Sequence, residues 1–463
     1  MGLVNSERRH PVALKSPVPQ PAARARSLRD YAAVAAVLLL AYAGDFRLNP
    51  LLSWMPVNLT GLGAALTGVG VLAVAGRSTI PRGTGPVLAL WALFMPAAIL
   101  HAPGSYADGM VTYLYTFTIL CALGPLFLMR SEVRQKLWVI MQIIFAAVLT
   151  GGALLSSHPQ LAADSQARVY LTGSNTINSG DTAAVVVLSC LILALTRRRT
   201  RGPMLALGGA AAVTMFAIGS RGPVLAIAVA LATVASFAPA SGVYRTVRIT
   251  AITLVLFLVW YFVRGDTTGG AGRIAATLLA GSDQDITSQL RLSLWREAWD
   301  VIPGHFWGLG WGGLSDLGPL RGGGLLGPTL PYPHDIWLQV TAEAGWIAGA
   351  ALIVFVLCSL RRLRRLAASP YPAVLFGMAV FWVIQASLSG DPNSFRCMWI
   401  SLAISWVTVG SRGQGEGIGY ASGVAPFGFD RDMMDLSAPE KAWRRRPRRA
   451  RRASAWPGGC RSC

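Results

Sequence analysis

The stretch PYPAVLFGMAVFWVIQASL at residues 370–388 decides the fold class, because it contains no charged side chain and is long enough to cross a bilayer. A helix of about 20 apolar residues spans the hydrocarbon core. Comparable runs occur at 29–44, 57–75, 86–101, 111–129, 137–156, 176–195, 203–218, 223–239, 249–263, 335–357 and 395–410. Backbone polar groups in lipid must be paired within the protein, so each run is predicted to be a helix. The sequence therefore predicts an all-α polytopic membrane protein with about twelve transmembrane helices.

The composition supports the same class. The chain has 463 residues, of which 53% are hydrophobic and 13% are charged, whereas soluble domains have about 25% charged residues. The formal net charge is +20. Much of this charge lies in short connections between spans and in the Arg-rich segment 444–452, where anionic lipid headgroups attract it. We therefore expect membrane lipids as partners and no nucleic acid.

Positive charge is divided unequally between the connections. With the amino terminus inside, the short outer connections hold only Arg47, Arg168 and Arg221, against fifteen Lys and Arg residues in the inner ones. Cytoplasmic connections carry the excess of Lys and Arg. We predict a multi-pass protein of the cytoplasmic (inner) membrane with both termini cytoplasmic.

These assignments divide the chain into five parts. They are a disordered basic N-terminal tail at 1–28, transmembrane helices 1–9 at 29–263, one long extracytoplasmic loop with short helices at 264–334, transmembrane helices 10–12 at 335–410, and a disordered Arg-rich cytoplasmic tail at 411–463. The long loop is where we expect chemistry, since a channel or carrier has little need of it.

His334 stands where the long loop enters the next apolar run. Pro331 and Pro333 restrict the approach, and Asp335 is a plausible N-cap of the following helix. The positive end of that helix favours a neutral imidazole, whereas the Asp335 carboxylate acts in the opposite direction. From this context His334 is either a general base or a capping, interfacial histidine.

Two further elements of the outer side carry arginine. In Ser220-Arg221-Gly222-Pro223, a guanidinium lies at a helix start, which makes an anion site or a snorkelling arginine. The predicted helix 286–302 places Arg291, Trp295 and Trp299 on one face at four-residue spacing, flanked by Arg296. This helix either lies along the membrane surface or packs the loop onto the bundle. The glycine-rich stretch 308–313 that follows would permit close approach of backbone to a ligand.

Metal and cofactor motifs are weak. Asp283-Gln284-Asp285 matches the D-x-D spacing of metal-dependent sugar transferases, but such matches are frequent by chance and nucleotide sugars are not expected outside the cytoplasm. His and Cys residues show no zinc spacing. We predict neither a metal nor a cofactor.

In this order, these elements resemble the O-antigen ligase and polymerase family of polysaccharide-assembling membrane proteins. The resemblance covers roughly residues 175–360, and the residues that carry it are Ser220-Arg221-Gly222, Arg291 with Trp295, Gly308-x-Gly310 with Gly312, Pro333-His334-Asp335-x-x-Leu338, and Glu343-Ala344-Gly345. One position departs from the family pattern, which usually has Asn where this chain has Asp335.

The resemblance implies a GT-C-like glycosyltransferase that transfers a glycan from a polyprenyl-diphosphate carrier to a hydroxyl of a glycan, lipid or protein acceptor, without a metal and with inversion. Arg221 and Arg291 would then bind the diphosphate, with Arg296 in support. His334 would take the proton of the acceptor hydroxyl. Glu343 would orient or relay, or make a helix-packing contact.

Two other classes remain open on the sequence. A transporter or flippase also has about twelve spans, but such folds are usually built from repeated halves, and this chain shows no internal symmetry. A scaffolding component of envelope assembly is the third class. Single substitution of Arg221, Arg291 and His334 tests the enzyme, which predicts that lipid-linked precursor accumulates and product falls. A scaffold predicts that these substitutions are silent while deletion is not.

Overall fold

The computed structural model describes residues 27–46, 58–76, 79–155, 176–218, 220–237, 286–316, 332–367 and 369–408. All regular elements in these ranges are helical, which confirms the predicted all-α membrane class. By length and composition, six helices can cross a membrane, at Tyr106–Leu128, Glu132–Gly152, Ile177–Thr196, Arg201–Ile218, Trp346–Leu366 and Pro370–Ser389. The predicted span 249–263, the tail 411–463 and the Asp283-Gln284-Asp285 motif lie outside the described residues.

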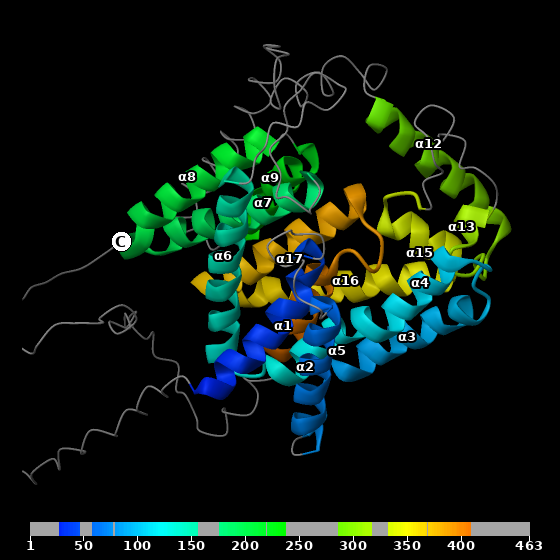
Figure 1. The fold of residues 1–463 in the computed structure, drawn as a ribbon, viewed down its shortest axis with the longest axis horizontal. Coiled ribbons are helices and arrows are strands. Elements are labelled where there is room, and N and C mark those ends of the chain that lie inside the picture. The colour runs from blue at the N-terminus through cyan, green and yellow to red at the C-terminus, as the bar shows by residue number, and fades with distance from the viewer. Residues whose placement is uncertain are drawn as a thin grey trace, which may run out of the picture. The chain divides into compact units, whose positions relative to one another are not determined.

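The helices follow the predicted apolar runs closely (Figure 1). In chain order they are α1 (Leu28–Phe46), α2 (Leu59–Ala75), α3 (Thr84–Ile99), α4 (Ser105–Tyr113), the π-helical turn η2 (Leu114–Thr118), α5 (Ile119–Leu128), α6 (Glu132–Leu155), α7 (Thr176–Thr196), η3 (Arg198–Thr200), α8 (Arg201–Ile218), α9 (Arg221–Phe237), α12 (Ile286–Val301), η5 (Ile302–Gly304), α13 (Gly313–Asp316), α15 (Ile336–Ala344), α16 (Trp346–Leu366), α17 (Pro370–Ser389) and α18 (Arg396–Thr408).

The predicted single span 335–357 is wrong, because the helix breaks at Gly345 into α15 and α16. Gly345 has φ +89°, which favours glycine. The next residue, Trp346, donates its backbone N–H to the carbonyl of Phe306 at 3.0 Å. A Cβ on Gly345 would lie 2.7 Å from that same carbonyl oxygen. The loop after α12 therefore occupies the break, and tertiary contact ends the helix.

The segment 306–312 connects two parts of the bundle through its backbone. Gly308, Gly310 and Gly312 all have positive φ, and a Cβ on the first two would collide with the backbone of Glu343 and of Leu100, respectively. The backbone hydrogen bonds are Leu309 N–H to Ala342 at 3.0 Å, Gly310 N–H to Glu343 at 2.9 Å, Trp311 N–H to Ala97 at 3.0 Å and Ala102 N–H to Trp311 at 3.0 Å. The glycines therefore permit close approach of the protein's own backbone, and the expectation of a ligand there is wrong.

Helix α17 forms the centre of the hydrophobic core. It is buried along most of its length and packs against α6, α7, α9, α16 and α18, among which it lies in Figure 1. Its carboxyl end reaches the elements that carry the predicted site. This geometry follows from a sequence in which apolar side chains surround the helix on all sides.

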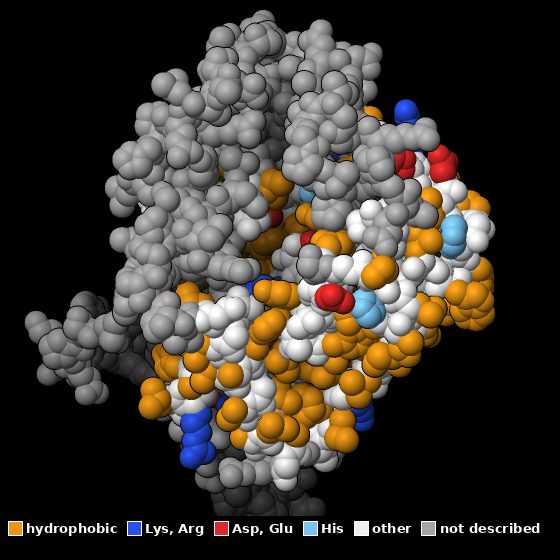
Figure 2. All heavy atoms as spheres, turned by 45° about the vertical axis from the view of Figure 1, so that its right-hand side comes forward, with side chains coloured by type: hydrophobic (Ala, Val, Ile, Leu, Met, Phe, Trp, Pro, Cys, Tyr) orange, Lys and Arg blue, Asp and Glu red, His pale blue; other side chains and the backbone are white. Residues whose placement is uncertain are grey.

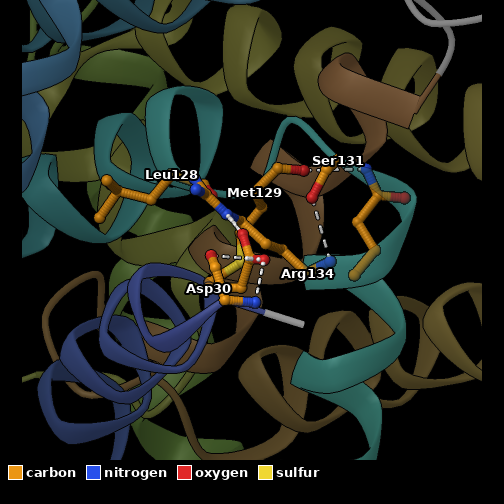
Figure 3. Close-up of polar contacts among 7 residues, drawn as sticks. Asp30, Leu128, Met129, Ser131 and Arg134 are labelled. Atoms are coloured by element: carbon orange, nitrogen blue, oxygen red, sulfur yellow. Dashed lines mark hydrogen bonds and ion pairs between the residues drawn. The ribbon is translucent and has the colours of Figure 1, made fainter. Parts of the chain in front are cut away.

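Basic residues of the connections predicted to be inside are held by specific partners. Arg134 of α6 donates Nε to Asp30 Oδ1 of α1 at 2.6 Å and Nη1 to the Leu128 carbonyl at 2.9 Å. Figure 3 shows this junction. Arg362 lies over the Trp406 ring at 3.7 Å from its centroid. Such partners anchor cationic side chains at helix ends without further chemistry.

Candidate active site

The last turn of α17 is where two of the predicted site residues meet. Arg291 of α12 donates Nη1 to the Leu388 carbonyl at 3.1 Å and Nη2 to Ser389 Oγ at 3.4 Å. The imidazole of His334 hydrogen-bonds the backbone of Ser389. Carbonyl groups at a helix carboxyl end carry partial negative charge, which favours a guanidinium there. The structure therefore brings Arg291 and His334 to one helix end from segments more than 40 residues apart.

The backbone of His334 has an unusual, left-handed conformation. Its φ is 56°, and it is the only non-glycine residue with positive φ in the described part of the chain. Such strain persists only where surrounding contacts enforce it, and it gathers at functional sites. Its ring packs on that of Tyr332, with centroids 4.2 Å apart and an interplanar angle of 47°. The backbone strain and the ring contact together orient the imidazole.

The His334 imidazole is neutral at physiological pH. Burial, together with the nearby Arg291 guanidinium, lowers the pKa of His334 to about 4, and the hydrogen bond to Ser389 opposes this only partly. The Nδ1 atom is buried and has no hydrogen-bond partner among the described residues. Nδ1 is thus an acceptor in place for a ligand hydroxyl.

Asp335 is the N-cap of α15, as predicted. Its Oδ1 accepts the backbone N–H groups of Trp337 at 2.8 Å and Leu338 at 2.9 Å. Burial raises the pKa of Asp335 to about 6, and the two N–H donors oppose that increase. Since Asn caps helices as well as Asp does, the departure from the family's usual Asn preserves the cap. The capping role left open for His334 therefore belongs to its neighbour.

The start of α9 faces α17 one turn before the Arg291 contacts. Arg221 is the first residue of α9, and a Cβ on Gly222 would lie 3.0 Å from Gln385 Oε1 of α17. Gln385 precedes Ser389 by one helical turn. The helix N-terminus with its N–H groups thus lies near the turn that holds Arg291 and His334. The side chain of Arg221 is outside the described part of the structure.

Gln385 is a residue that sequence reasoning missed. Its side chain is fully buried, and neither Oε1 nor Nε2 has a hydrogen-bond partner in the described ranges. A buried amide without partners is costly and calls for an explanation such as a bound ligand. The available signal was its position as the one amide in the apolar stretch 370–388.

Arg296 is not brought to the site. It is exposed on α12, and five residues of helix rotate it roughly 140° from Arg291. Trp299, on the face predicted for Arg291 and Trp295, has an exposed fraction of 62%, which agrees with the membrane-surface alternative. On another face of α12, Ala298 is buried with Ile302 against Leu314 and Ala342. Aliphatic packing onto α15 sets the rotation of α12.

Glu343 lies deep beneath the site. Its side chain is fully buried, and its Oε2 accepts from Gln339 Nε2 at 3.1 Å. The backbone N–H groups of Gly312 and Leu314 also hydrogen-bond the carboxylate. These contacts are all with the protein's own packing elements, so of the two roles left open for Glu343 they favour a packing contact that holds the loop 308–314 on α15.

An open hollow of about 290 Å³ has Tyr332 in its wall. Its walls consist of Tyr106, Gly109, Met110, Tyr113, Tyr332, Asp391 and Asn393. Figure 2 shows a face of the molecule on which hydrophobic side chains frame a recess with acidic and histidine side chains inside it. Within the described ranges, no three His, Cys, Asp or Glu side chains are placed to hold a metal ion.

Comparison with known families decides the assignment. The family described as O-Antigen ligase matches residues 184–354. Over this segment the chain is similar to the O-antigen ligase family. The matched segment runs from α7 into α16 and contains Arg221, Arg291 and His334. The predicted resemblance is therefore confirmed.

The match to the O-antigen ligase family indicates a ligase- or polymerase-type function in polysaccharide assembly. No curated protein matches the chain. The apolar spans and the family agree that the protein is a multi-pass membrane protein.

Proposed function

We propose that the protein transfers a glycan from a polyprenyl-diphosphate carrier to a hydroxyl of a glycan, lipid or protein acceptor at the outer face of the cytoplasmic membrane. In this proposal both termini are cytoplasmic, and the reaction inverts the anomeric centre without a metal. The observation that carries it is the meeting of Arg291 and His334 at the last turn of α17, next to the start of α9. A cation, a neutral base and a helix N-terminus are the groups that this transfer requires.

The donor diphosphate binds between α9 and α12. A diphosphate leaving group gains negative charge as its bond to the sugar breaks, and guanidinium groups neutralise that charge. Arg291 stands at this place, fixed by Leu388 and Ser389. Arg221 begins α9, whose free N–H groups favour an anion. The buried amide of Gln385 lies beside Gly222 and supplies a donor for a phosphate oxygen.

His334 acts as the general base. The acceptor hydroxyl transfers its proton to Nδ1 while its oxygen forms the bond to the anomeric carbon. The bond from that carbon to the diphosphate breaks on the opposite face, and the diphosphate leaves with the electron pair. We assign the proton transfer to Nδ1 because this ring nitrogen has no hydrogen-bond partner in the described ranges. Attack opposite to the leaving group accounts for inversion.

Donor binding strengthens this base. In the free protein, burial and the Arg291 charge lower the pKa of His334 to about 4. A bound diphosphate places negative charge against Arg291 and opposes that charge effect, so the pKa of His334 rises towards its ordinary value of 6.5. The imidazole therefore becomes a better proton acceptor only when the donor is in place.

The test replaces His334 with Ala and follows lipid-linked glycan and finished product in membranes. We expect transfer to fall at least ~100-fold, as general-base loss does, and the glycan carrier to accumulate in the outer leaflet. Arg296→Ala is the matched control, because Arg296 is exposed and distant from Arg291 around α12. Unchanged product with His334→Ala excludes the proposal. Accumulation in the inner leaflet instead identifies a flippase.

A further inference from the structure

We infer that the hollow beside Tyr332 is a subsite for one sugar ring of the acceptor, held by Tyr106, Tyr113 and Tyr332. This inference rests on the proposed function, since it gives a binding place to the acceptor whose hydroxyl transfers its proton to His334. Tyr332 connects the two places, because its ring contacts the His334 ring and also forms a wall of the hollow. A sugar seated there lies one aromatic ring away from the proposed base.

The chemistry of the walls fits a neutral polyol. Three tyrosines line the hollow together with Asp391 and Asn393. Amphipathic aromatic rings with a few placed polar groups are the usual make-up of small-ligand sites. The walls contain an acidic residue and neither Lys nor Arg. A diphosphate is therefore disfavoured in the hollow, and the donor's charged group belongs on the Arg291 side of His334.

The size also points to a single ring. Small-molecule sites begin at about 300 Å³, and the hollow has about 290 Å³. Three of the seven wall residues are tyrosines. An aromatic ring suits the apolar face of a sugar, and a phenolic hydroxyl suits its polar edge. One residue of a glycan, with the rest of the acceptor outside, satisfies both the volume and the chemistry.

The polar wall is rigid before any ligand arrives. Asp391 Oδ1 accepts the backbone N–H groups of Asn393 at 2.8 Å and Ser394 at 3.1 Å, and its other oxygen accepts from the Ser394 hydroxyl. Asn393 donates Nδ2 to the Met110 carbonyl at 3.0 Å and accepts from Thr118 Oγ1 at 2.7 Å. The loop after α17 is thus fixed to α4 and η2.

The π-helical turn η2 contributes to the placement of Tyr113. It begins at Leu114, directly after Tyr113, and ends at Thr118, which bonds Asn393. Single π-helical turns inside α-helices occur frequently at functional sites because they shift the side chains on either side. Tyr113 also packs against Phe117 of this turn, with centroids 5.0 Å apart. Asp391 and Asn393 therefore position the walls, and the tyrosines contact the sugar.

Binding is tested directly with methyl glycosides of common hexoses, using saturation-transfer NMR on the full chain in nanodiscs. We expect at least one glycoside to receive saturation from the wild type and to lose it in Tyr113→Leu. Arg291→Ala should retain the signal, as should Tyr31→Leu, which changes an exposed tyrosine of α1. Inorganic diphosphate should bind Tyr113→Leu as it binds the wild type, which shows that the variant is folded. Tyr113→Phe should weaken binding less, because it keeps the ring.

Two results overturn the subsite. One is the absence of saturation transfer to every hexoside by a wild type that binds inorganic diphosphate. The other is an equal signal from Tyr113→Leu. These results are independent of the proposed reaction, because a wild type that binds hexosides but transfers no glycan refutes the proposed function and leaves the subsite standing. In a transfer assay, Tyr113→Leu should raise the acceptor KM about tenfold while the donor KM stays constant, and a parallel rise in the donor KM assigns the hollow to the donor.

Discussion

The two ends of α17 each hold an arginine, and they hold it differently. At the amino end, Arg197 lies over the Tyr371 ring at 4.5 Å from its centroid and donates to the Tyr371 hydroxyl at 3.2 Å. At the carboxyl end, Arg291 contacts Leu388 and Ser389, and the neighbouring polar atoms of His334 and Gln385 lack partners in the described part of the chain. A membrane protein anchors arginines at many places. At the carboxyl end of α17 the arginine lies beside a strained histidine and a buried amide without partners, and the amino end has neither among the residues that the structure describes.

The largest expected effect comes from exchanging arginine for lysine at the two ends. Arg291→Lys removes the planar donor set that suits a diphosphate, and we expect transfer to fall about 100-fold, the loss typical of one transition-state donor. Arg197→Lys should stay within about twofold, since an anchoring contact contributes only about 0.5–1 kcal/mol to stability at an exposed site. Product formation from a lipid-linked donor measures both. Equal losses at the two ends would remove the distinction between them.

A smaller effect is expected from closing the gap between α9 and α17. In Gly222→Ala the new Cβ lies 3.0 Å from Gln385 Oε1, so the amide must shift away from the predicted anion site. We expect a loss of about tenfold in transfer, the equivalent of roughly 1.4 kcal/mol, with little change in thermal unfolding. Gly209→Ala on α8 is the control, because its Cβ meets nothing within 4 Å. If Gly222→Ala kept wild-type activity, the start of α9 would have no part in the reaction.

The pH dependence sharpens the comparison further. His334 must be neutral to accept a proton, and its pKa in the free protein is lowered to about 4. The acid limb of kcat/KM, which reports the free protein, should therefore lie well below pH 6. The limb of kcat, which reports the donor complex, should lie at higher pH because bound diphosphate raises the pKa of His334. Coincident limbs would contradict coupling between Arg291 and His334.

The smallest effect concerns the cap of α15. Asp335→Ala removes the acceptor of two N–H groups and should cost about 1 kcal/mol, whereas Asp335→Asn retains the cap. The native state holds the Asp335 proton more tightly, since burial raises its pKa from 3.8 to about 6. Its contribution to stability is therefore complete below about pH 4 and is lost as pH rises to about 6. Thermal unfolding of Asp335→Asn should lack this decline, and an identical pH profile in both proteins would refute it.

The sequence predicts those helices well that are apolar along their whole length, because burial in lipid and burial in protein both require such a run. Long apolar runs identify α7 and α17 almost to the residue. The break at Gly345 escaped notice because residues on both sides stay apolar, and its partner, Phe306, is distant in the chain. The packing of α12 depends on distant partners in the same way. Its buried Ala298 lies against Leu314 and Ala342, which belong to other helices.

The site was predictable in its cations and its imidazole, and less so in its surroundings. Arg221, Arg291 and His334 carry unusual chemistry for outer connections, so each is visible in isolation. Gln385 and Asn393 become meaningful only beside Gly222 and Met110, which lie in other helices. Nothing in the order of residues indicates that these elements converge. A single sequence does not show which distant segments contact each other, so this part of the site could not be predicted.

The backbone connections made by segment 306–312 restrict how a bulky glycan reaches His334. Five main-chain hydrogen bonds join this segment and its flanks to α3, α15 and α16, and each contributes about 0.5–1.5 kcal/mol. An outward movement of the segment would break these five hydrogen bonds together and expose its glycine backbone. This segment is therefore a fixed part of the site. Under the proposed function, the acceptor glycan would approach from the side of Tyr106 and Tyr332, where the hollow is open.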